Sequence, residues 1–545
     1  MAWNKHPRPQ MQREEYSVLN DGWELGSRPI RIPFPPQSKL SGYEGEVGDI
    51  LEYTCRFCVP DTWSGGRILL HFGAVDQIAK VCVNGTEVGS HEGGYLPFTF
   101  DVTKLLESND NCLQVTAIDE LSQDYPYGKQ CKKPHGMWYT PVSGIWQQVW
   151  LEHVPEVYIE KLKITPSLDA VKIEVVCNQK EESVHVSIAL PDGKKTATEL
   201  AGGNCEIRIP NPHLWSPDDP YLYDMTITAG EDCVKSYFAL RTIEIRKMDG
   251  VNRVCLNGEP IFLHGVLDQG YFEEGIFLPE TEEGYEKDIL NMKELGFNLL
   301  RKHIKVEPEY FYYACDKIGM LVMQDMVNNG SYNFLRDTAL PTVGFKKRRD
   351  RNLNRSQKVR EVFRLHTGET IEHLYNHPCI VAYTIFNEGW GQFLADEMYD
   401  LVKGLDATRL VDATSGWFAQ TKSDFDSEHI YFRLKKLCPK ERPLFISECG
   451  GYQYMIKEHF FGEKEYGYGA CKDSDDLTSR IEEMYEKMLL PYIADGVCGC
   501  IYTQLSDVEG EINGMYTYDR KVCKVDKKRM QTIAEKLGDK KFYEK

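Results

Sequence analysis

The segment from residue 380 to residue 388 constrains the fold of this chain more than any other. Its first eight residues are mostly apolar, and the carboxylic acid Glu388 and a glycine follow at once. A short apolar run of this kind is typical of a buried parallel strand with a carboxyl group at its C-terminal end. The same order recurs from Leu444 to Glu448. One such glutamate alone is as well explained by a helix cap or an ion pair, but two indicate paired carboxyl groups at one end of a barrel.

The chain from about residue 249 onward alternates between short apolar strands and amphipathic helices. The expected strands are Ile261–Val266, Asn298–Arg301, Leu321–Asp325, Ile380–Glu388, Leu410–Ala413, Glu428–Ile430, Leu444–Glu448 and Val497–Gln504. Helices are expected between them, for example over 281–295, where Tyr285 and Ile289 share one face, and a last helix over 531–537. Eight strand–helix units predict a TIM barrel over residues 249–545.

The first part of the chain, residues 1–155, is predicted to be a β-sandwich of the sugar-binding, jelly-roll-like kind. Alternating apolar runs lie between turns, and Asn84-Gly85 joins two of them as a hairpin turn. Aromatic side chains are frequent here, and their faces can stack on sugars. Residues 156–248 contain six or seven further short strands and are expected to form an immunoglobulin-like sandwich.

Composition excludes several classes of partner. The chain of 545 residues has a formal net charge of −19, which argues against unspecific binding to nucleic acid or to an anionic membrane surface. No stretch reaches the roughly 18 apolar residues needed to span a bilayer, and the first residues lack a signal core. The 17 cysteines favour free thiols in the cytoplasm. We see no cluster of metal ligands and expect no cofactor, while assembly into a homo-oligomer is left open.

Strand ends of a TIM barrel meet at one face, so Glu388 and Glu448 are predicted to point into one mouth from opposite sides. Retaining cleavage of a glycosidic bond needs two carboxyl groups about 5–5.5 Å apart, one as nucleophile and one as acid and then base. Asn387 beside Glu388 can donate to a sugar hydroxyl. Further polar candidates for substrate contact lie near the other strand ends, and these are His264, Asp268, Arg301, Lys302, His303, Trp417 and Gln504.

These motifs resemble glycoside hydrolase family 2, the family of β-galactosidases, β-glucuronidases and β-mannosidases. The resemblance includes Pro33–Ser38, Ser143–Trp150 and Leu263–Val266 as well as the two glutamates, and it covers nearly the whole chain. It implies two sandwiches before a barrel, with Glu388 in the acid/base motif Asn-Glu and Glu448 as the nucleophile.

The chain departs from the family pattern in three places. The family's Arg-x-Ser-His element is one residue shorter here, as Arg301-Lys302-His303, and the aromatic residue at the end of the last strand is replaced by Thr503-Gln504. Glucuronidases of the family carry an Asn-x-Lys element that grips the sugar carboxylate, whereas Asn513-Gly514-Met515 lacks the lysine.

The sequence therefore predicts a retaining exo-β-glycosidase that acts on a glycoside or oligosaccharide, with β-galactosides as the expected substrates. The alternative within enzymes is a β-glucuronidase or another uronidase, for which Lys302 could serve as the partner of the sugar carboxylate. The alternative outside enzymes is a carbohydrate-binding protein without catalysis, which the presence of both glutamates and of Asn387 disfavours.

Overall fold

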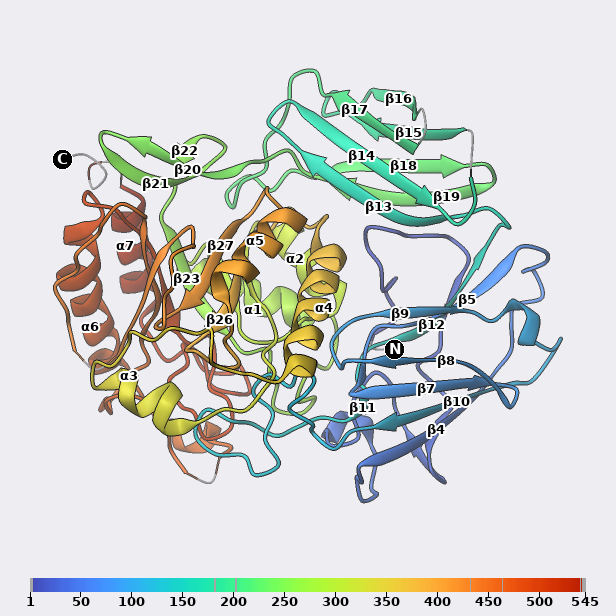
Figure 1. Ribbon diagram of the computed structural model, residues 1–545, viewed down its shortest axis with the longest axis horizontal. Coiled ribbons are helices and arrows are strands. Elements are labelled where there is room, and N and C mark those ends of the chain that lie inside the picture. The colour runs from blue at the N-terminus through green and yellow to red at the C-terminus, as the bar shows by residue number, and fades with distance from the viewer. Residues whose placement is uncertain are drawn as a thin grey trace.

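The computed structural model describes residues 3–180, 183–200, 203–431, 433–462, 464–539 and 541. Two β-sandwiches lie side by side along one flank of a barrel that contains the C-terminal half of the chain (Figure 1). The N-terminal segment runs through the junction of all three parts, where the Trp3 indole donates to the carbonyl of Pro279 at 3.1 Å. The predicted order of two sandwiches and a barrel is confirmed.

The first sandwich is built from two antiparallel sheets. One sheet contains β1 (Tyr16–Val18), β12 (Val149–Val154), β5 (Arg67–Phe72) and β9 (Phe98–Asp101). The other contains β3 (Arg28–Ile30), β2 (Trp23–Leu25), β4 (Ile50–Phe57), β10 (Asn111–Ile118), β7 (Ile78–Val83) and β8 (Thr86–Glu92), and the short strands β6 (Val75–Asp76) and β11 (Gly144–Ile145) pair separately. The predicted hairpin turn joins β7 to β8, with positive φ at both Asn84 and Gly85.

The second sandwich stacks a three-stranded sheet on a four-stranded one. The strands are β13 (Ile159–Pro166), β14 (Ala170–Cys177) and β17 (Asn204–Arg208), and β16 (Lys195–Leu200), β15 (Val184–Ala189), β18 (Tyr223–Ala229) and β19 (Asp232–Phe238). A small sheet of β20 (Ile243–Met248), β21 (Val251–Leu256) and β22 (Glu259–Pro260) then leads into the barrel.

The barrel is a sheet of eight parallel strands that neighbour one another in chain order and leave one unpaired seam between the fifth and the sixth. The strands are β23 (Leu263–Asp268), β24 (Leu299–Lys302), β25 (Leu321–Asp325), β26 (Ile380–Asn387), β27 (Leu410–Ser415), β28 (Asp426–Ile430), β29 (Leu444–Gly450) and β30 (Val497–Thr503). Every residue of β26 is buried, which explains its nearly continuous apolar sequence.

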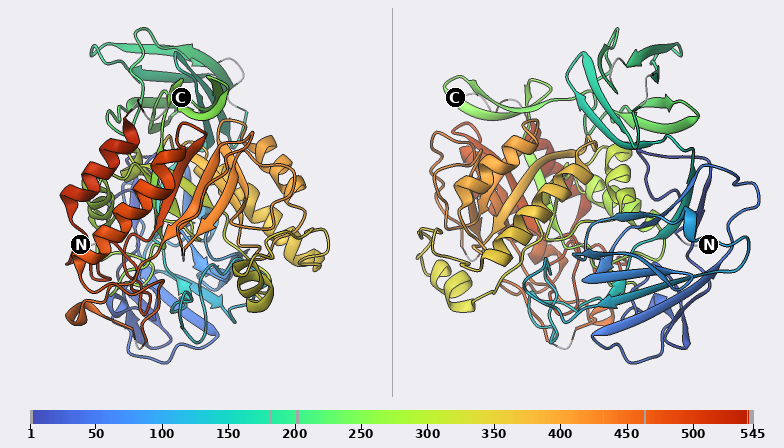
Figure 2. Two further views of the ribbon diagram at one scale, coloured as in Figure 1. Left: turned by 90° about the vertical axis from the view of Figure 1, so that its left-hand side faces the viewer. Right: turned by 45° about the vertical axis from the view of Figure 1, so that its right-hand side comes forward.

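Helices cover the outside of the barrel, as both views in Figure 2 show. The long ones are α1 (Glu283–Glu294), α2 (Glu309–Ile318), α4 (Gln357–Leu374), α5 (Ala395–Leu405), α6 (Ser474–Met484) and α7 (Lys527–Gly538). Short helical turns add η1 (Lys39–Ser41), η2 (Thr103–Leu105), η4 (Leu335–Ala339), α3 (Leu340–Thr342), η5 (Lys457–His459), η6 (Tyr485–Leu489) and η7 (Leu490–Tyr492). The expectation of a helix after every strand is wrong for two connections, because the described residues between β27 and β28 and between β28 and β29 form loops.

A long loop of the first sandwich, between β10 and β11, extends to the barrel and passes beneath it in Figure 1. The Tyr127 hydroxyl on this loop donates to the carbonyl of Gly330, 3.0 Å away, after β25. The backbone N–H of Thr140 on the same loop donates to a Glu509 oxygen after β30 at 2.9 Å. The loop therefore joins the strand-end face of the barrel and brings side chains of the sandwich to it.

Candidate active site

Glu388 and Glu448 line one pocket at the carboxyl ends of the barrel strands. Glu388 directly follows β26, and Glu448 lies near the end of β29. One oxygen of each carboxyl group and a ring nitrogen of His429, on β28, all lie within 4.8 Å of one another. A double displacement at one sugar carbon needs two carboxyl groups about 5–5.5 Å apart, and these two lie near enough to each other to act on the same carbon. The same three atoms are within reach of a common metal ion, but two of them belong to the carboxyl groups that this chemistry needs.

The backbone turns sharply at the end of β26 and thereby aims Glu388 into the pocket. Glu388 has a φ of +51°, a value that non-glycine residues rarely adopt, and Gly389 follows with a φ of +74°. The Trp417 indole N–H fixes this turn by donating to the carbonyl of Glu388 at 2.9 Å. A Cβ at Gly389 would lie 2.3 Å from a ring carbon of Phe418, so the turn accepts only glycine there.

Gly389→Ala is expected to lower kcat/KM by roughly 100-fold, because a displacement of the Glu388 carboxyl group by about 1 Å can reduce the rate by this factor. The left-handed backbone and the Phe418 ring both resist the added methyl group. Steady-state kinetics on an aryl glycoside together with a melting curve will measure the effect. Gly48→Ala is the matched control, since a Cβ at Gly48 meets nothing within 4 Å. A folded Gly389→Ala enzyme with unchanged kcat/KM would contradict this account of the turn.

Glu448 is surrounded by hydrogen-bond donors. Nη1 of the fully buried Arg301 lies 3.2 Å from Oε1 of Glu448, and the Tyr431 hydroxyl donates to Oε2. Arg301 is itself fixed on the opposite side by an ion pair of 2.9 Å with Asp325. Charge-assisted donors in this arrangement suit a carboxylate that carries its negative charge and can attack carbon.

Glu388 lies in a different environment. Burial raises the pKa of its carboxyl group to about 7, although Lys129, Arg301 and Lys346 oppose the shift. Nδ1 of His429 lies 2.9 Å from Oε1 of Glu388, and burial lowers the pKa of this imidazole to about 3, which keeps the ring neutral. Glu388 therefore keeps its proton up to a pH of about 7, far above the range in which an ordinary glutamate loses it, and this is what a general acid needs.

The pKa of Glu388 predicts the basic limb of the pH profile. A general acid is active in its protonated form, so in that role Glu388 would make kcat/KM fall as the pH rises through about 7. Lys346→Met removes a cation that lowers this pKa, so the limb should move to higher pH in that variant. The profile of kcat/KM for an aryl glycoside, measured for both proteins, tests the assignment. If the basic limb of the profile has the same midpoint in Lys346→Met as in the wild type, the assignment of this limb to Glu388 is contradicted.

Several residues predicted from the sequence meet at this pocket. His303, Asn387, Glu388 and Glu448 line it, while Arg301 and Trp417 lie directly behind the two glutamates. Arg301 Nη2 donates to Oδ1 of Asn387 at 2.9 Å, which leaves the amide NH₂ group as the donor for a sugar hydroxyl. His303 contacts Asp325 through Nδ1 at 2.6 Å.

Lys302 and Asp268 lie elsewhere, in contrast to the prediction. The Nζ of Lys302 contacts Asp268 at 2.6 Å and Glu307 at 2.8 Å, and it lies 4.3 Å from the ring centroid of Phe311 on α2. Successive side chains of a strand alternate between its two faces, so Arg301 points into the barrel and Lys302 points out toward the helices. Lys302 is therefore already paired and is not placed to receive a sugar carboxylate.

His264 and Gln504 are also absent from the residues that line the pocket. His264 lies at the start of β23, where its ring contacts the carbonyl of Gly296 and the hydroxyl of Tyr485, each at 2.9 Å. Gln504 donates to the side chain of Asn513 at 2.9 Å. His264 lies at the amino-terminal end of its strand, which is the end away from the pocket. Gln504 directly follows the carboxyl end of β30, so its strand end does not account for its absence from the pocket.

Other residues of the pocket were not predicted from the sequence as site residues. These are Lys129, Met137, Leu267, Gln269, Trp390, Tyr431, Tyr468 and Glu511. Thr503, noted above for its position at the end of the last strand, lines the pocket as well. Most lie on irregular loops, including the loop between β10 and β11, and their spacing carries no periodic signal. Polar residues directly after a predicted strand, such as Gln269, are the ones that a wider search of the strand ends could find.

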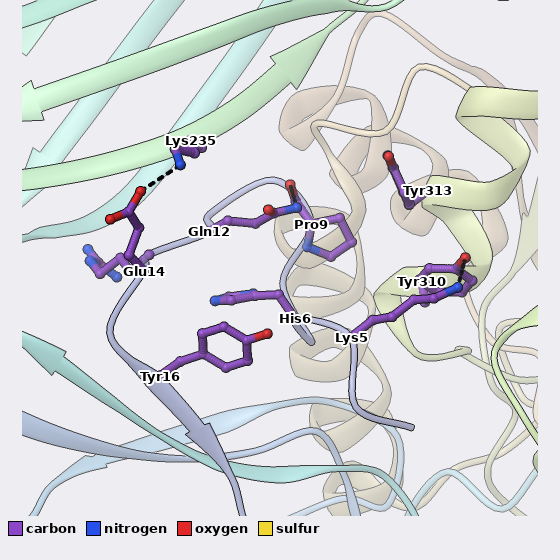
Figure 3. Close-up of a pocket in the computed structure, with 10 residues that line it drawn as sticks. Lys5, His6, Pro9, Gln12, Glu14, Tyr16, Lys235, Tyr310 and Tyr313 are labelled. Atoms are coloured by element: carbon purple, nitrogen blue, oxygen red, sulfur yellow. Dashed lines mark hydrogen bonds and ion pairs between the residues drawn. The ribbon is translucent and has the colours of Figure 1, made fainter. Parts of the chain in front are cut away.

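A second cavity, of about 420 Å³, lies where the N-terminal segment passes between the second sandwich and α2 (Figure 3). Glu14 pairs with Lys235 there at 2.8 Å, and Lys5 donates to the Tyr310 hydroxyl at 2.6 Å. None of the predicted strand-end residues lines this cavity. Among the helices of the described ranges, none combines the length and the apolar character that a membrane crossing requires.

Comparison with known proteins agrees with this architecture in all three parts. Residues 48–154 match the glycosyl hydrolase 2 galactose-binding domain-like model, residues 157–241 match the model of glycosyl hydrolases family 2, and residues 245–490 match the family's TIM barrel domain.

The chain is similar to both β-galactosidases and β-glucuronidases. It is 28% identical over 443 residues to a β-galactosidase of Thermoanaerobacter pseudethanolicus, covering 75% of this chain and 54% of that protein. It is 27% identical over 391 residues to a β-glucuronidase of Paenibacillus borealis, covering 66% and 62%. The chain thus spans about half the length of the first relative. In structure it superimposes on a β-glucuronidase of an uncultured Clostridium species with a TM-score of 0.76, at 19% identity over 97% of this chain and 99% of that one.

Proposed function

We propose that this chain, which belongs to glycosyl hydrolase family 2, is a retaining exo-β-glycosidase that removes terminal β-linked sugars. The observation that supports this most directly is the pair of strand-end carboxyl groups, Glu388 and Glu448, with atoms within 4.8 Å and with different environments. The donors around Glu448 stabilise a negative charge on its carboxylate, and the burial of Glu388 favours its protonated form.

The first step of the proposed reaction forms a bond between Glu448 and the sugar. A Glu448 oxygen attacks the anomeric carbon, the bond from that carbon to the leaving oxygen breaks, and Glu388 gives its proton to the leaving oxygen. In the second step Glu388 takes a proton from water, the hydroxide attacks the same carbon, and the bond to Glu448 breaks. Two inversions give net retention, and Glu388 regains its proton. Asn387 holds a neighbouring sugar hydroxyl through its NH₂ group.

β-Galactosides are the first candidate substrates. A uronide would bring a carboxylate into a buried pocket and would need a cation to offset its desolvation. Among the described residues after β30, no lysine or arginine lines the pocket: Met515 is fully buried, and Lys524 is paired with Asp507 at 2.7 Å. A neutral sugar does not need such a partner.

β-Glucuronides and other uronides are the second candidate, which one observation favours. Lys129 lines the pocket with 7% of its surface exposed, and within the described part of the chain its Nζ contacts aromatic rings but no carboxylate. A buried cation of this kind can pair with an acidic sugar.

A panel of aryl β-glycosides tests the proposal. We expect the galactoside to have a higher kcat/KM than the glucuronide, the galacturonide, the mannoside and the arabinoside, and we expect NMR to show that the first product keeps the β configuration. Faster turnover of a uronide would favour the second candidate. Sugar binding without turnover of any substrate in the panel would instead support a carbohydrate-binding protein.

A further inference from the structure

Lys129 is held in the pocket by the loop between β10 and β11. The backbone N–H of Tyr139 donates to the carbonyl of Lys129 at 3.0 Å, and that of Cys131 donates to the carbonyl of Tyr139 at 3.0 Å, so the two arms of the loop pair as a short ladder. The preceding Gly128 has a φ of +63°, and a Cβ there would lie 2.8 Å from the carbonyl oxygen of Ile304. The loop is therefore in tight contact with the barrel, and the position of the lysine is fixed.

Glu511 reaches the same pocket from the segment after β30. Its backbone exchanges two hydrogen bonds of 2.9 Å with Val508, which closes a tight turn. Its carboxylate accepts from the Tyr139 hydroxyl at Oε2 and from the Asn513 amide at Oε1, 3.0 Å away. A carboxylate offers about four acceptor positions, so these two contacts leave room for donors from a ligand.

Tyr139 is near both charged groups. The Nζ of Lys129 is 5.9 Å from the centroid of its ring, and the Glu511 carboxylate contacts its hydroxyl. Lys129 and Glu511 form no ion pair within 4.0 Å in the described structure, although both are buried and line one pocket. The side chain of Gln269 adds a buried acceptor, since its Oε1 has no hydrogen-bond partner there.

We propose that Lys129, Gln269 and Glu511 form a subsite that selects an uncharged sugar through its hydroxyl groups. A hydroxyl can accept from Lys129 and donate to Glu511 or Gln269 at the same time. A sugar carboxylate can accept from Lys129 but cannot donate to the other two, and its charge would lie beside that of Glu511. The subsite rests on the proposed glycosidase function and identifies the groups that exclude uronides.

The matched probes for this subsite are an aryl β-galactoside and the aryl β-galacturonide, which differ only in a CH₂OH group against a carboxylate at C6. We expect Glu511→Gln to lower kcat/KM for the galactoside by about 10- to 100-fold, as the loss of a hydrogen bond to a charged group does. The ratio of galacturonide to galactoside kcat/KM should rise by at least about 10-fold, because the repulsive charge is gone. Lys129→Met should lower kcat/KM for the galactoside without raising it for the galacturonide.

Two control variants separate the subsite from general effects. Glu509→Gln neutralises the neighbouring acid, which contacts the loop at Thr140 but does not line the pocket. Lys132→Met removes an exposed cation from the same loop as Lys129. Both should leave the ratio of the two substrates unchanged, and a melting curve for each variant shows whether it is folded.

Binding of D-galactose and D-galacturonate, measured by calorimetry on the same variants, gives a result that does not depend on turnover. Suppose that the wild type hydrolyses the galactoside, but Glu511→Gln changes neither the ratio of the two kcat/KM values nor the ratio of the two binding affinities. The subsite is then wrong, while the glycosidase function stands. If the wild type prefers the galacturonide and Lys129→Met abolishes that preference, Lys129 recognises an acid and the subsite is overturned. If no glycoside is turned over but galactose binding depends on Glu511, the catalytic proposal fails and the subsite remains.

Discussion

Glu448→Ala is expected to abolish turnover of aryl glycosides, and azide is expected to restore it with a product of inverted anomeric configuration. Removal of the carboxylate leaves a space beside the anomeric carbon, in front of Arg301 and Tyr431. Azide can enter this space and displace an activated leaving group from the same side as Glu448 would. Because no glycosyl-enzyme forms, only one inversion occurs. Release of the aryl group with and without azide, and NMR of the glycosyl azide, will measure this.

Glu428→Ala is the control for this experiment, since Glu428 lies on a neighbouring strand and pairs at the surface with Lys435. A surface ion pair contributes little to the stability of a protein, so the variant should fold, and its kcat should stay within about a factor of five of the wild type. Retained configuration in the azide product of Glu448→Ala would assign the nucleophile to another residue and contradict the mechanism.

The catalytic pair could be predicted from the sequence because barrel topology converts a one-dimensional pattern into a position in space. An apolar strand that ends in a glutamate places that glutamate at the strand-end face, whichever strand it is. Glu388 and Glu448 obey this rule and line one pocket. The rule does not say which of two adjacent residues points inward. All four residues of β24 are buried, so the sequence alone could not separate Arg301, which faces the barrel interior, from Lys302, which faces α2.

The rest of the pocket could not be predicted, because it depends on contacts between segments far apart in the chain. Lys129 belongs to the first sandwich and Glu511 to the segment after the last strand, yet both meet Tyr139. Neither lies in a periodic element, and their proximity results from how the sandwich loop packs on the barrel. His429 and Tyr431 lie at the end of the sixth strand, where loops replace the expected helices, so the pattern gave little indication of their roles.

Glu388→Ala is expected to slow substrates with poor leaving groups by about 10²–10⁴-fold and to affect activated aryl glycosides far less. Loss of the acid matters only where the leaving oxygen needs a proton, so a plot of log kcat/KM against leaving-group pKa should become steeper. Hydrolysis of the glycosyl-enzyme also loses its base, and azide, which needs none, should then give a product of retained configuration because Glu448 is still present. Glu388→Gln keeps the size of the side chain and its contact with His429 and should show the same dependence, which separates lost proton transfer from lost packing. Equal slowing of good and poor leaving groups in both variants would exclude Glu388 as the acid and leave the raised pKa of this buried carboxyl group without a catalytic purpose.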